Sequence, residues 1–285
     1  MSRYAYVNGQ YLPLSVAGVH VEDRGYQFAD GVYEVVAVAN GHAIDEEAHL
    51  ARLDYSLKEM SLAWPVSKAA LKHILKRMVA LNRLTNGLLY LQITRGVSRR
   101  DHGFPKPGVP PALVVTAKNM KPVSPELLEK GVAVVTMPDL RWKRCDIKSV
   151  SLLPNILAKQ AAKDMGAYEA WLLDDKGYVT EGSSTNAWIV TDKGEIVTRP
   201  LGAPILAGVT RRAILALAKE AGLKPVERPF KPAEALKAKE AFLTSATSWA
   251  LPITRIDGKP VGDGKPGPMT LRLRALYAQA VEKGL

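Results

Sequence analysis

The sequence has 285 residues, of which 47% are hydrophobic and 24% charged, a balance typical of globular proteins rather than of disordered or fibrous chains. The 39 Lys and Arg residues outnumber the 28 Asp and Glu residues and give a net charge of +11, but no basic cluster is interleaved with aromatic residues, so we expect no nucleic-acid partner. The single cysteine, Cys145, excludes an intramolecular disulfide bond. No apolar run, at the N-terminus or elsewhere, approaches the about 18 residues of a membrane-spanning helix. We therefore expect a cytoplasmic protein with no membrane partner.

The first part of the chain predicts short strands, two helices and one long loop. Asn8-Gly9 and Asn40-Gly41 are hairpin turn signals. Leucines at spacings of three and four predict a helix over residues 45–61, and Ser67 is a suitable N-cap for a second helix over residues 67–81. Strands are expected at residues 32–39, 88–94 and 112–116. The segment between the last two, residues 95–111, is rich in Gly, Pro and charge, and loops of such length are usually functional.

The second part of the chain predicts a separate domain. Residues 118–125 carry two prolines and no periodic pattern, and they are the expected linker. Strands are then expected at 132–137, 170–173, 187–191 and 241–244, and helices at 152–164, at 210–221 and from about 269 onward. Because strands and helices mix without regular alternation, the pattern predicts an α+β fold with a smaller N-terminal domain (1–117) and a larger C-terminal domain (126–285).

Two familiar site signatures do not fit. Gly262-Asp-Gly264-Lys-Pro-Gly267 has the spacing of a dinucleotide-binding turn, but it lies near the C-terminus and contains a proline, so we interpret it as a loop. The five histidines show no metal-ligand pairing and Cys145 stands alone, so no metal site is expected.

Four other segments contain residues suited to cofactor chemistry. Lys148, before an apolar run, is either a surface lysine or a buried amine able to attack an aldehyde. Residues 180–186 are either a solvent loop or a close approach to a ligand, in which Glu181 would face a cationic ring nitrogen. Gly208-Val209-Thr210-Arg211 is either an ordinary helix start or a phosphate site. Arg52 either extends into solvent beside the apolar stripe or reaches a buried anion.

The order and spacing of these motifs resemble those of a known family. H-L-x-R-L at 49–53 is followed by Lys148 before S-x-x-L-L, then by E-G-x-S-x-N at 181–186 and G-x-T-R at 208–211. This set is similar to the fold-type IV pyridoxal-phosphate (PLP) enzymes, which include D-amino-acid, branched-chain L-amino-acid and (R)-amine transaminases. The resemblance covers nearly the whole chain and implies the two-domain fold of that family, with a C-terminal domain that is α/β-barrel-like.

Within the family, the chain most resembles the bacterial D-amino-acid transaminases. Residues 22–35 and 89–96 are similar to theirs, and the long loop carries Arg100 and His102, an R-x-H pair that binds the substrate α-carboxylate in those enzymes. The forked guanidinium of an arginine suits a carboxylate. In the family this loop reaches the active site of the partner subunit, so the resemblance implies an obligate homodimer.

The resemblance implies a reaction and a set of site residues. A D-amino acid such as D-alanine would pass its amino group to a 2-oxo acid such as 2-oxoglutarate or pyruvate by a ping-pong mechanism, with PLP as cofactor. Lys148 would be the Schiff-base lysine and proton shuttle, and Glu181 would pair with the ring nitrogen. The cofactor-binding residues would be Arg52, Lys148, Glu181, Val209, Thr210, Ala246 and Thr247, and the substrate-binding residues would be Tyr33, Tyr90, Arg100 and His102.

Two departures from the family pattern leave alternatives open. Ala246 stands where relatives usually have Thr, which removes one hydroxyl from the phosphate site, and Trp249 stands where they often have Glu. A branched-chain L-amino-acid or (R)-amine transaminase therefore remains the alternative enzyme. A protein that binds PLP without turnover is the alternative outside enzymes.

Overall fold

The computed structural model describes residues 3–284, which divide into two compact units. The first unit contains residues up to Lys121 together with Ile147–Ser151, and the second contains Pro122–Asp146 and the residues from Leu152 onward. The sequence predicted a linker at 118–125, and the two units divide between Lys121 and Pro122. The strand before this point ends at Asn119, and a helix begins at Pro125. The sequence did not predict that Ile147–Ser151 would belong to the first unit.

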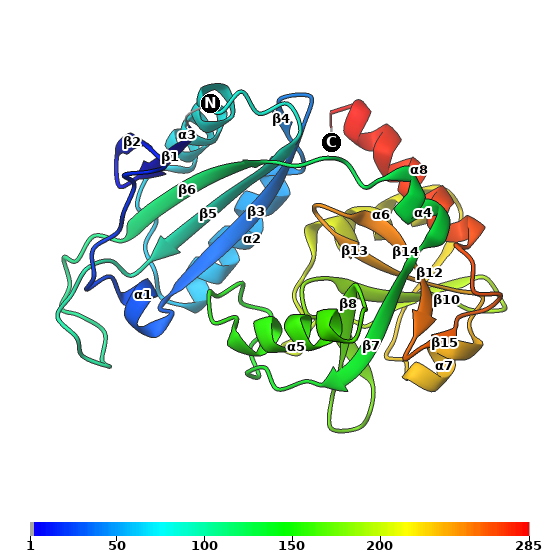
Figure 1. Ribbon diagram of the computed structural model, residues 1–285. Helices are drawn as coiled ribbons and strands as arrows, with labels where there is room; N and C mark the ends of the chain where they lie inside the picture. The colour runs from blue at the N-terminus through cyan, green and yellow to red at the C-terminus, as the bar shows by residue number, and fades with distance from the viewer. Residues whose placement is uncertain (1–2, 285) are drawn as a thin grey trace. The chain divides into compact units, whose positions relative to one another are not determined.

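The first unit is built on a six-stranded antiparallel sheet with the strand order β2-β1-β6-β5-β3-β4 (Figure 1). Both predicted hairpin turns are confirmed. Asn8 and Asn40 have φ angles of 45° and 51°, and each is followed by a glycine with positive φ, as this tight turn requires. The elements are β1 (Tyr4–Val7), β2 (Gln10–Pro13), α1 (Arg24–Phe28), β3 (Gly31–Ala39), β4 (His42–Ala43), α2 (Glu46–Glu59), α3 (Lys68–Leu81), β5 (Gly87–Thr94) and β6 (Ala112–Asn119).

Helices α2 and α3 pack against this sheet, α2 through the leucine spacing that predicted it. Leu50, Leu53 and Leu57 of α2 are buried in one cluster with the valines of β3. The predicted cap of α3 is confirmed, because the Ser67 hydroxyl accepts a hydrogen bond from the Ala70 amide. Along β3, Val32, Glu34 and Val36 are fully buried. Side chains alternate along a strand, so Glu34 points to the same face as these valines.

The second unit contains a nine-stranded mixed sheet with the path β12-β11-β10-β13-β14-β7-β8-β9, and β15 pairs with β14. At the far end of the path β9 also contacts β10, so the sheet curls into the expected barrel-like form. The elements are α4 (Pro125–Lys130), β7 (Val132–Pro138), α5 (Leu153–Asp164), β8 (Glu169–Leu173), β9 (Val179–Gly182), β10 (Asn186–Val190), β11 (Glu195–Thr198), α6 (Val209–Glu220), β12 (Lys224–Glu227), α7 (Pro232–Lys237), β13 (Glu240–Ser245), β14 (Trp249–Ile256), β15 (Lys259–Pro260) and α8 (Pro268–Glu282).

Apolar side chains fill the interior of this curled sheet. Trp171, Phe230 and Leu251 are fully buried there. The glycine-rich segment 262–267 lies in the loop between β15 and α8, which confirms that it is not the first turn of a dinucleotide-binding unit. Over residues 3–284, none of the helices combines the length and the apolar character needed to span a bilayer.

Candidate active site

The segment that carries Lys148 runs alongside the start of β3. The Tyr33 amide donates to the Lys148 carbonyl (3.0 Å), and the Lys148 amide donates to the buried hydroxyl of Ser56 on α2 (3.1 Å). These bonds fix the backbone, so the side chain leaves from a defined point. The Lys148 amine lies 4.1 Å from the centroid of the Tyr33 ring. Within residues 3–284 it has no carboxylate partner, so the amine is not neutralised by an ion pair.

Tyr33 and Tyr90 stand together on neighbouring strands. Their rings stack with centroids 5.6 Å apart, and the Tyr90 hydroxyl donates to the side chain of Gln92 (2.6 Å). Burial, with a smaller contribution from Tyr33, raises the pKa of Tyr90 to about 12, so its hydroxyl stays protonated and serves as a neutral donor. The structure therefore brings the predicted Tyr33, Tyr90 and Lys148 together in the first unit.

Arg52 lies in a buried polar network with Glu34 and His49. Its Nε and Nη2 atoms donate to the two carboxylate oxygens of Glu34 at 2.7 and 2.8 Å, and His49 Nδ1 lies 2.7 Å from the second oxygen. Burial alone raises the pKa of Glu34, but the charge and hydrogen bonds of Arg52 outweigh it and hold the pKa at about 2. Arg52 is thus a fixed cation whose orientation Glu34 determines.

Arg100 and His102 occupy the exposed loop that follows β5. The Arg100 guanidinium lies 4.7 Å from the centroid of the Phe28 ring, and the His102 ring lies 5.4 Å from the same ring. Both predicted substrate residues therefore flank one aromatic side chain of α1.

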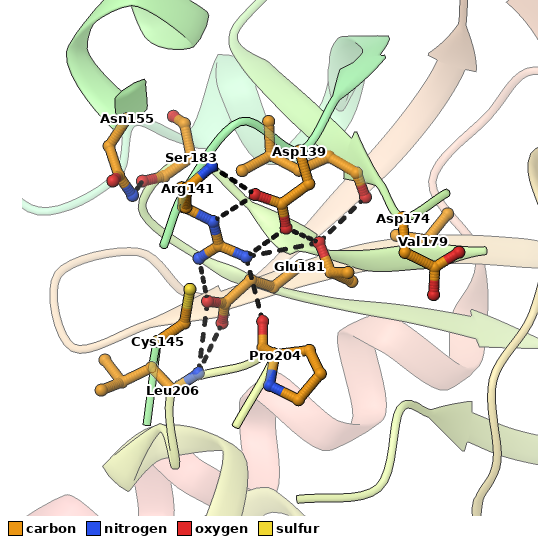
Figure 2. Close-up of polar contacts among 12 residues, drawn as sticks. Asp139, Arg141, Cys145, Asn155, Asp174, Val179, Glu181, Ser183, Pro204 and Leu206 are labelled. Carbon is orange, nitrogen blue, oxygen red and sulfur yellow. Dashed lines mark hydrogen bonds and ion pairs between the residues drawn. The ribbon is translucent and has the colours of Figure 1, made fainter. Parts of the chain in front are cut away.

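Glu181 lies on a strand, not in a loop. One of the two interpretations of residues 180–186 was a solvent loop, but Thr180–Gly182 belong to β9 and Asn186 begins β10. Figure 2 shows the polar contacts around the buried carboxylate. Glu181 accepts hydrogen bonds from Asn186 Nδ2 (2.9 Å) and from the Leu206 amide (3.2 Å), and it forms an ion pair with Arg141.

Arg141 is shared between two carboxylates. Its Nε and Nη2 atoms donate to Asp139 at 2.9 and 2.7 Å, while Nη1 pairs with Glu181 (Figure 2). Burial raises the pKa of Glu181, and the charge and hydrogen bonds of Arg141 do not fully reverse this, so the pKa stays above its ordinary value. The three side chains carry one positive and two negative charges, which leaves a net negative charge in a buried site.

The start of α6 has the features of an anion site. The Thr210 hydroxyl is buried and has no hydrogen-bond partner within the described residues, and Gly208 caps the helix without a side-chain bond. A Cβ atom on Gly208 would lie 2.0 Å from Asn186 Oδ1, so only glycine allows this approach. The Asn186 amide group also donates to Glu181 and to the Leu206 carbonyl, which links the Glu181 carboxylate to the segment before the helix. The helix N-terminus offers unpaired amides and a positive dipole end.

The hairpin between β13 and β14 carries the two departures from the family pattern. Ala246 is half-buried and Thr247 is exposed, so a hydroxyl is present one position later. Trp249 has a φ angle of 56°, which is unusual for a bulky residue. Its ring packs against Tyr277 of α8 and under the Arg274 guanidinium, with centroid distances of 5.4 and 5.2 Å. Trp249 is thus held against α8.

The side chains present suit the predicted cofactor. PLP needs an amine, an anionic partner for its ring nitrogen and donors for its phosphate. The unpaired amine of Lys148, the carboxylate of Glu181 and the orphan hydroxyl of Thr210 match these needs. Within residues 3–284, no group of His, Cys, Asp and Glu side chains is arranged to hold a metal ion.

Sequence reasoning missed the residues that orient the predicted ones. Glu34, Asp139 and Arg141 were not predicted as site residues, and Asn186 was quoted only as part of a motif. The short spacing of Asp139 and Arg141 is visible in the sequence, but it does not distinguish a buried pair from a solvated one.

Comparison with known proteins gives consistent findings. Residues 31–256 match the family Amino-transferase class IV. The D-alanine aminotransferase of Bacillus licheniformis is 40% identical over 274 residues, which are 96% of this chain and 95% of the relative. That of Staphylococcus aureus (strain MSSA476) is 39% identical over 279 residues, 97% of each chain.

Solved structures with the same fold include two branched-chain amino acid aminotransferases. The T.th. enzyme with pyridoxamine 5'-phosphate superposes with a TM-score of 0.90 at 26% identity, over 99% of this chain and 94% of that one. The Escherichia coli enzyme gives a TM-score of 0.86 at 25% identity, over 98% and 94% of the two chains.

Proposed function

Because the chain belongs to the class IV aminotransferases, we propose that it is a PLP-dependent transaminase that passes the amino group of a D-amino acid such as D-alanine to a 2-oxo acid such as 2-oxoglutarate or pyruvate. The observation that carries this proposal is the full-length similarity to D-alanine aminotransferases at about 40% identity. The ping-pong order of the two half-reactions follows from a cofactor that stores the amino group between them.

The residues of the first unit would act on the amino acid and the covalent link. When bound, PLP supplies an electron-withdrawing ring that stabilises negative charge on the substrate α-carbon. Lys148 would hold the cofactor through its amine and, once released, move a proton at that carbon. Tyr33 and Tyr90 would line the substrate side, and Arg100 and His102 would bind the carboxylate as hydrogen-bond donors.

The electrostatic roles are divided among fixed groups. Glu181 would face the ring nitrogen, and its raised pKa makes it a better proton acceptor than an ordinary carboxylate. The start of α6 would bind the phosphate through Val209 and the unpartnered hydroxyl of Thr210. The remaining phosphate ligands would be Arg52, Ala246 through its backbone, and Thr247.

A homodimer is also part of this proposal. Leu153, Ile156 and Leu157 lie at helical spacing on α5 and are 66%, 59% and 60% exposed. An apolar face of this kind marks an interaction surface, which a second copy would cover. Sedimentation should then give twice the chain mass of 31.0 kDa, whereas a species of 31.0 kDa would contradict the dimer. The single, buried Cys145 supports a reducing compartment, the cytoplasm.

The test combines absorbance with turnover. Purified wild-type protein should be yellow and should bleach with D-alanine but not with L-alanine. Lys148→Ala should abolish turnover with D-alanine and 2-oxoglutarate, while Lys76→Ala, an exposed lysine of α3, should leave it unchanged. Wild-type turnover in Lys148→Ala would remove Lys148 from its role.

The second candidate is a branched-chain L-amino-acid transaminase, which the fold similarity to two such enzymes favours. L-leucine replaces D-alanine in the same assay. Turnover with L-leucine and none with D-alanine would establish this alternative.

A further inference from the structure

The loop that carries Arg100 and His102 needs an external support. Residues 99–104 form no regular element, and most of them are exposed. A flexible segment that must be ordered at the moment of binding loses affinity, because the entropy of ordering opposes the interaction. The neighbouring parts of the first unit must therefore hold the loop if it is to present two side chains to a substrate.

Arg24 of α1 donates hydrogen bonds to the backbone of the loop. Its Nη1 atom donates to the Asp101 carbonyl (2.6 Å) and its Nη2 atom to the His102 carbonyl (3.4 Å). Within residues 3–284, the hydrogen bonds that reach residues 99–104 from outside the loop 95–111 are these two. They act on the backbone directly beside Arg100 and at His102 itself.

Phe28, one turn further along α1, contacts the side chains of the same loop. Its ring lies 4.7 Å from the Arg100 guanidinium and 5.4 Å from the His102 ring, and it also lies 4.9 Å from the Arg24 guanidinium. Contacts of a cation with an aromatic face are attractive and orient the guanidinium. One side chain therefore sets the directions of both predicted carboxylate ligands.

Asp30 anchors this support to the body of the unit. One of its oxygens accepts from Arg24 Nε and from Arg95 Nε, both at 2.8 Å, and Arg95 also donates to the carbonyls of Met60 and Ser61 after α2. Burial raises the pKa of Asp30, but the bonds from the two arginines outweigh this and keep it below its ordinary value. Arg24 and Arg95 share this carboxylate, which fixes the Arg24 guanidinium beside the loop.

From these contacts we infer that α1 is the platform that presets the loop for the substrate carboxylate, with Arg24 and Phe28 as positioning residues. This inference rests on the proposed function, because it assigns a support to the carboxylate-binding pair of that same site. Arg24 fixes the loop backbone and Phe28 fixes the two side chains, so the carboxylate ligands are oriented before the substrate binds.

The first experiment needs no substrate. Limited trypsin digestion of the full-length protein, followed by mass spectrometry, measures cleavage after Arg99 and Arg100. We expect Phe28→Leu and Arg24→Lys to speed this cleavage about three- to tenfold, the change that loss of one or two such contacts allows. Tyr26→Leu is the matched control, because Tyr26 is on the same helix and 76% exposed, and it should cleave like wild type.

The second experiment separates positioning from general damage. Phe28→Leu should raise the KM for D-alanine about three- to tenfold and change kcat less than twofold, since the reacting groups are untouched. The affinity for PLP, measured by absorbance titration, should stay the same. Arg24→Lys keeps the charge but loses the planar fork, so a similar KM change in this variant identifies geometry as the cause.

The outcomes separate this inference from the proposed function. Wild-type cleavage rates and KM values in both variants, or faster cleavage at all sites alike in both, would overturn the platform. If wild-type protein transfers no amino group from D-alanine, the proposed function fails. The digestion still decides whether α1 holds the loop.

Discussion

Two buried glutamates, one in each unit, pair with an arginine and yet differ in proton affinity. Glu34 accepts two hydrogen bonds from Arg52 and a third contact from His49, and its pKa is held at about 2. Glu181 pairs with Arg141, but its pKa lies above the ordinary value. The difference arises because Arg52 gives two of its donors to Glu34, whereas Arg141 gives two of its donors to Asp139.

An ion pair alone therefore does not set the charge state of a buried carboxylate. The number of anions that share the cation matters as much as the distance. Glu34 stays ionised except in strong acid, and its carboxylate orients Arg52. Glu181 retains affinity for a proton and suits a partner for a cationic ring nitrogen.

Removal of the Glu34 carboxylate should lower the stability of the protein most. Glu34→Gln leaves Arg52 without its anion in a buried site, and we expect a loss of about 3–5 kcal/mol in the free energy of unfolding. Urea denaturation measures it. Glu47→Gln is the matched control, since Glu47 is 79% exposed and water screens its pairing with Lys72, so this variant should lose much less stability. Equal losses in the two variants would show that the Glu34 network has no special weight.

Removal of the Glu181 carboxylate should affect activity more than stability. In Glu181→Gln, Arg141 keeps its bonds to Asp139, so the loss of stability should be smaller than for Glu34→Gln. Turnover with D-alanine should fall about 10²–10³-fold, the usual loss for one preorganised electrostatic group. Steady-state kinetics and urea denaturation of the same preparation compare the two effects. A variant with nearly normal kcat would separate Glu181 from the reaction.

The pH dependence of stability should have opposite signs for the two glutamates. The pKa of Glu34 is below its ordinary 4.5, so its contribution is present above pH 4.5 and is lost as pH falls toward 2. The pKa of Glu181 is raised, so its contribution is present below pH 4.5 and is lost as pH rises through the raised pKa.

Urea denaturation from about pH 3 to 8 tests these signs. Glu34→Gln should flatten the loss of stability on acidification, and Glu181→Gln should steepen it. The same change of slope in both variants would contradict the contrast.

A smaller effect, a change in the pKa of Glu181, is expected when Asp139 is replaced. Asp139→Asn removes a negative charge that raises the pKa of Glu181 and weakens the competing hold on Arg141, so the Glu181 pKa should fall. Carbon-13 NMR titration of the glutamate carboxyl groups measures this in the protein without cofactor, with Glu181→Gln to assign the signal. A pKa that rises or stays constant would show that Arg141 is not effectively shared.

The sequence predicted those elements whose side chains repeat regularly. Leucine spacing identified α2, a serine suited to an N-cap identified the start of α3, and the branched residues of β3 identified that strand. Helix α1 escaped prediction because Arg24–Phe28 is too short for a period, and β14 escaped because Pro252 is unusual inside a sheet.

The motifs in the sequence identified candidate site residues, but not the residues that orient them through hydrogen bonds and ion pairs. Lys148 and Glu181 stand in recognisable segments. Arg24, Arg141 and Asp139 act through pairings made only in the folded chain, and a lone arginine in a sequence does not show whether it is buried. Supporting residues of this kind can be identified only from a three-dimensional structure.

The pairing of β14 with β7 has a consequence for biosynthesis. All strands of the first sheet lie between Tyr4 and Asn119, so that sheet can form while later residues are still on the ribosome. The second sheet cannot close until Ile256 has been made, because β7 waits for a partner more than a hundred positions downstream. Nascent chains therefore expose an open strand edge for much of translation, and chaperones would have their main task at that edge.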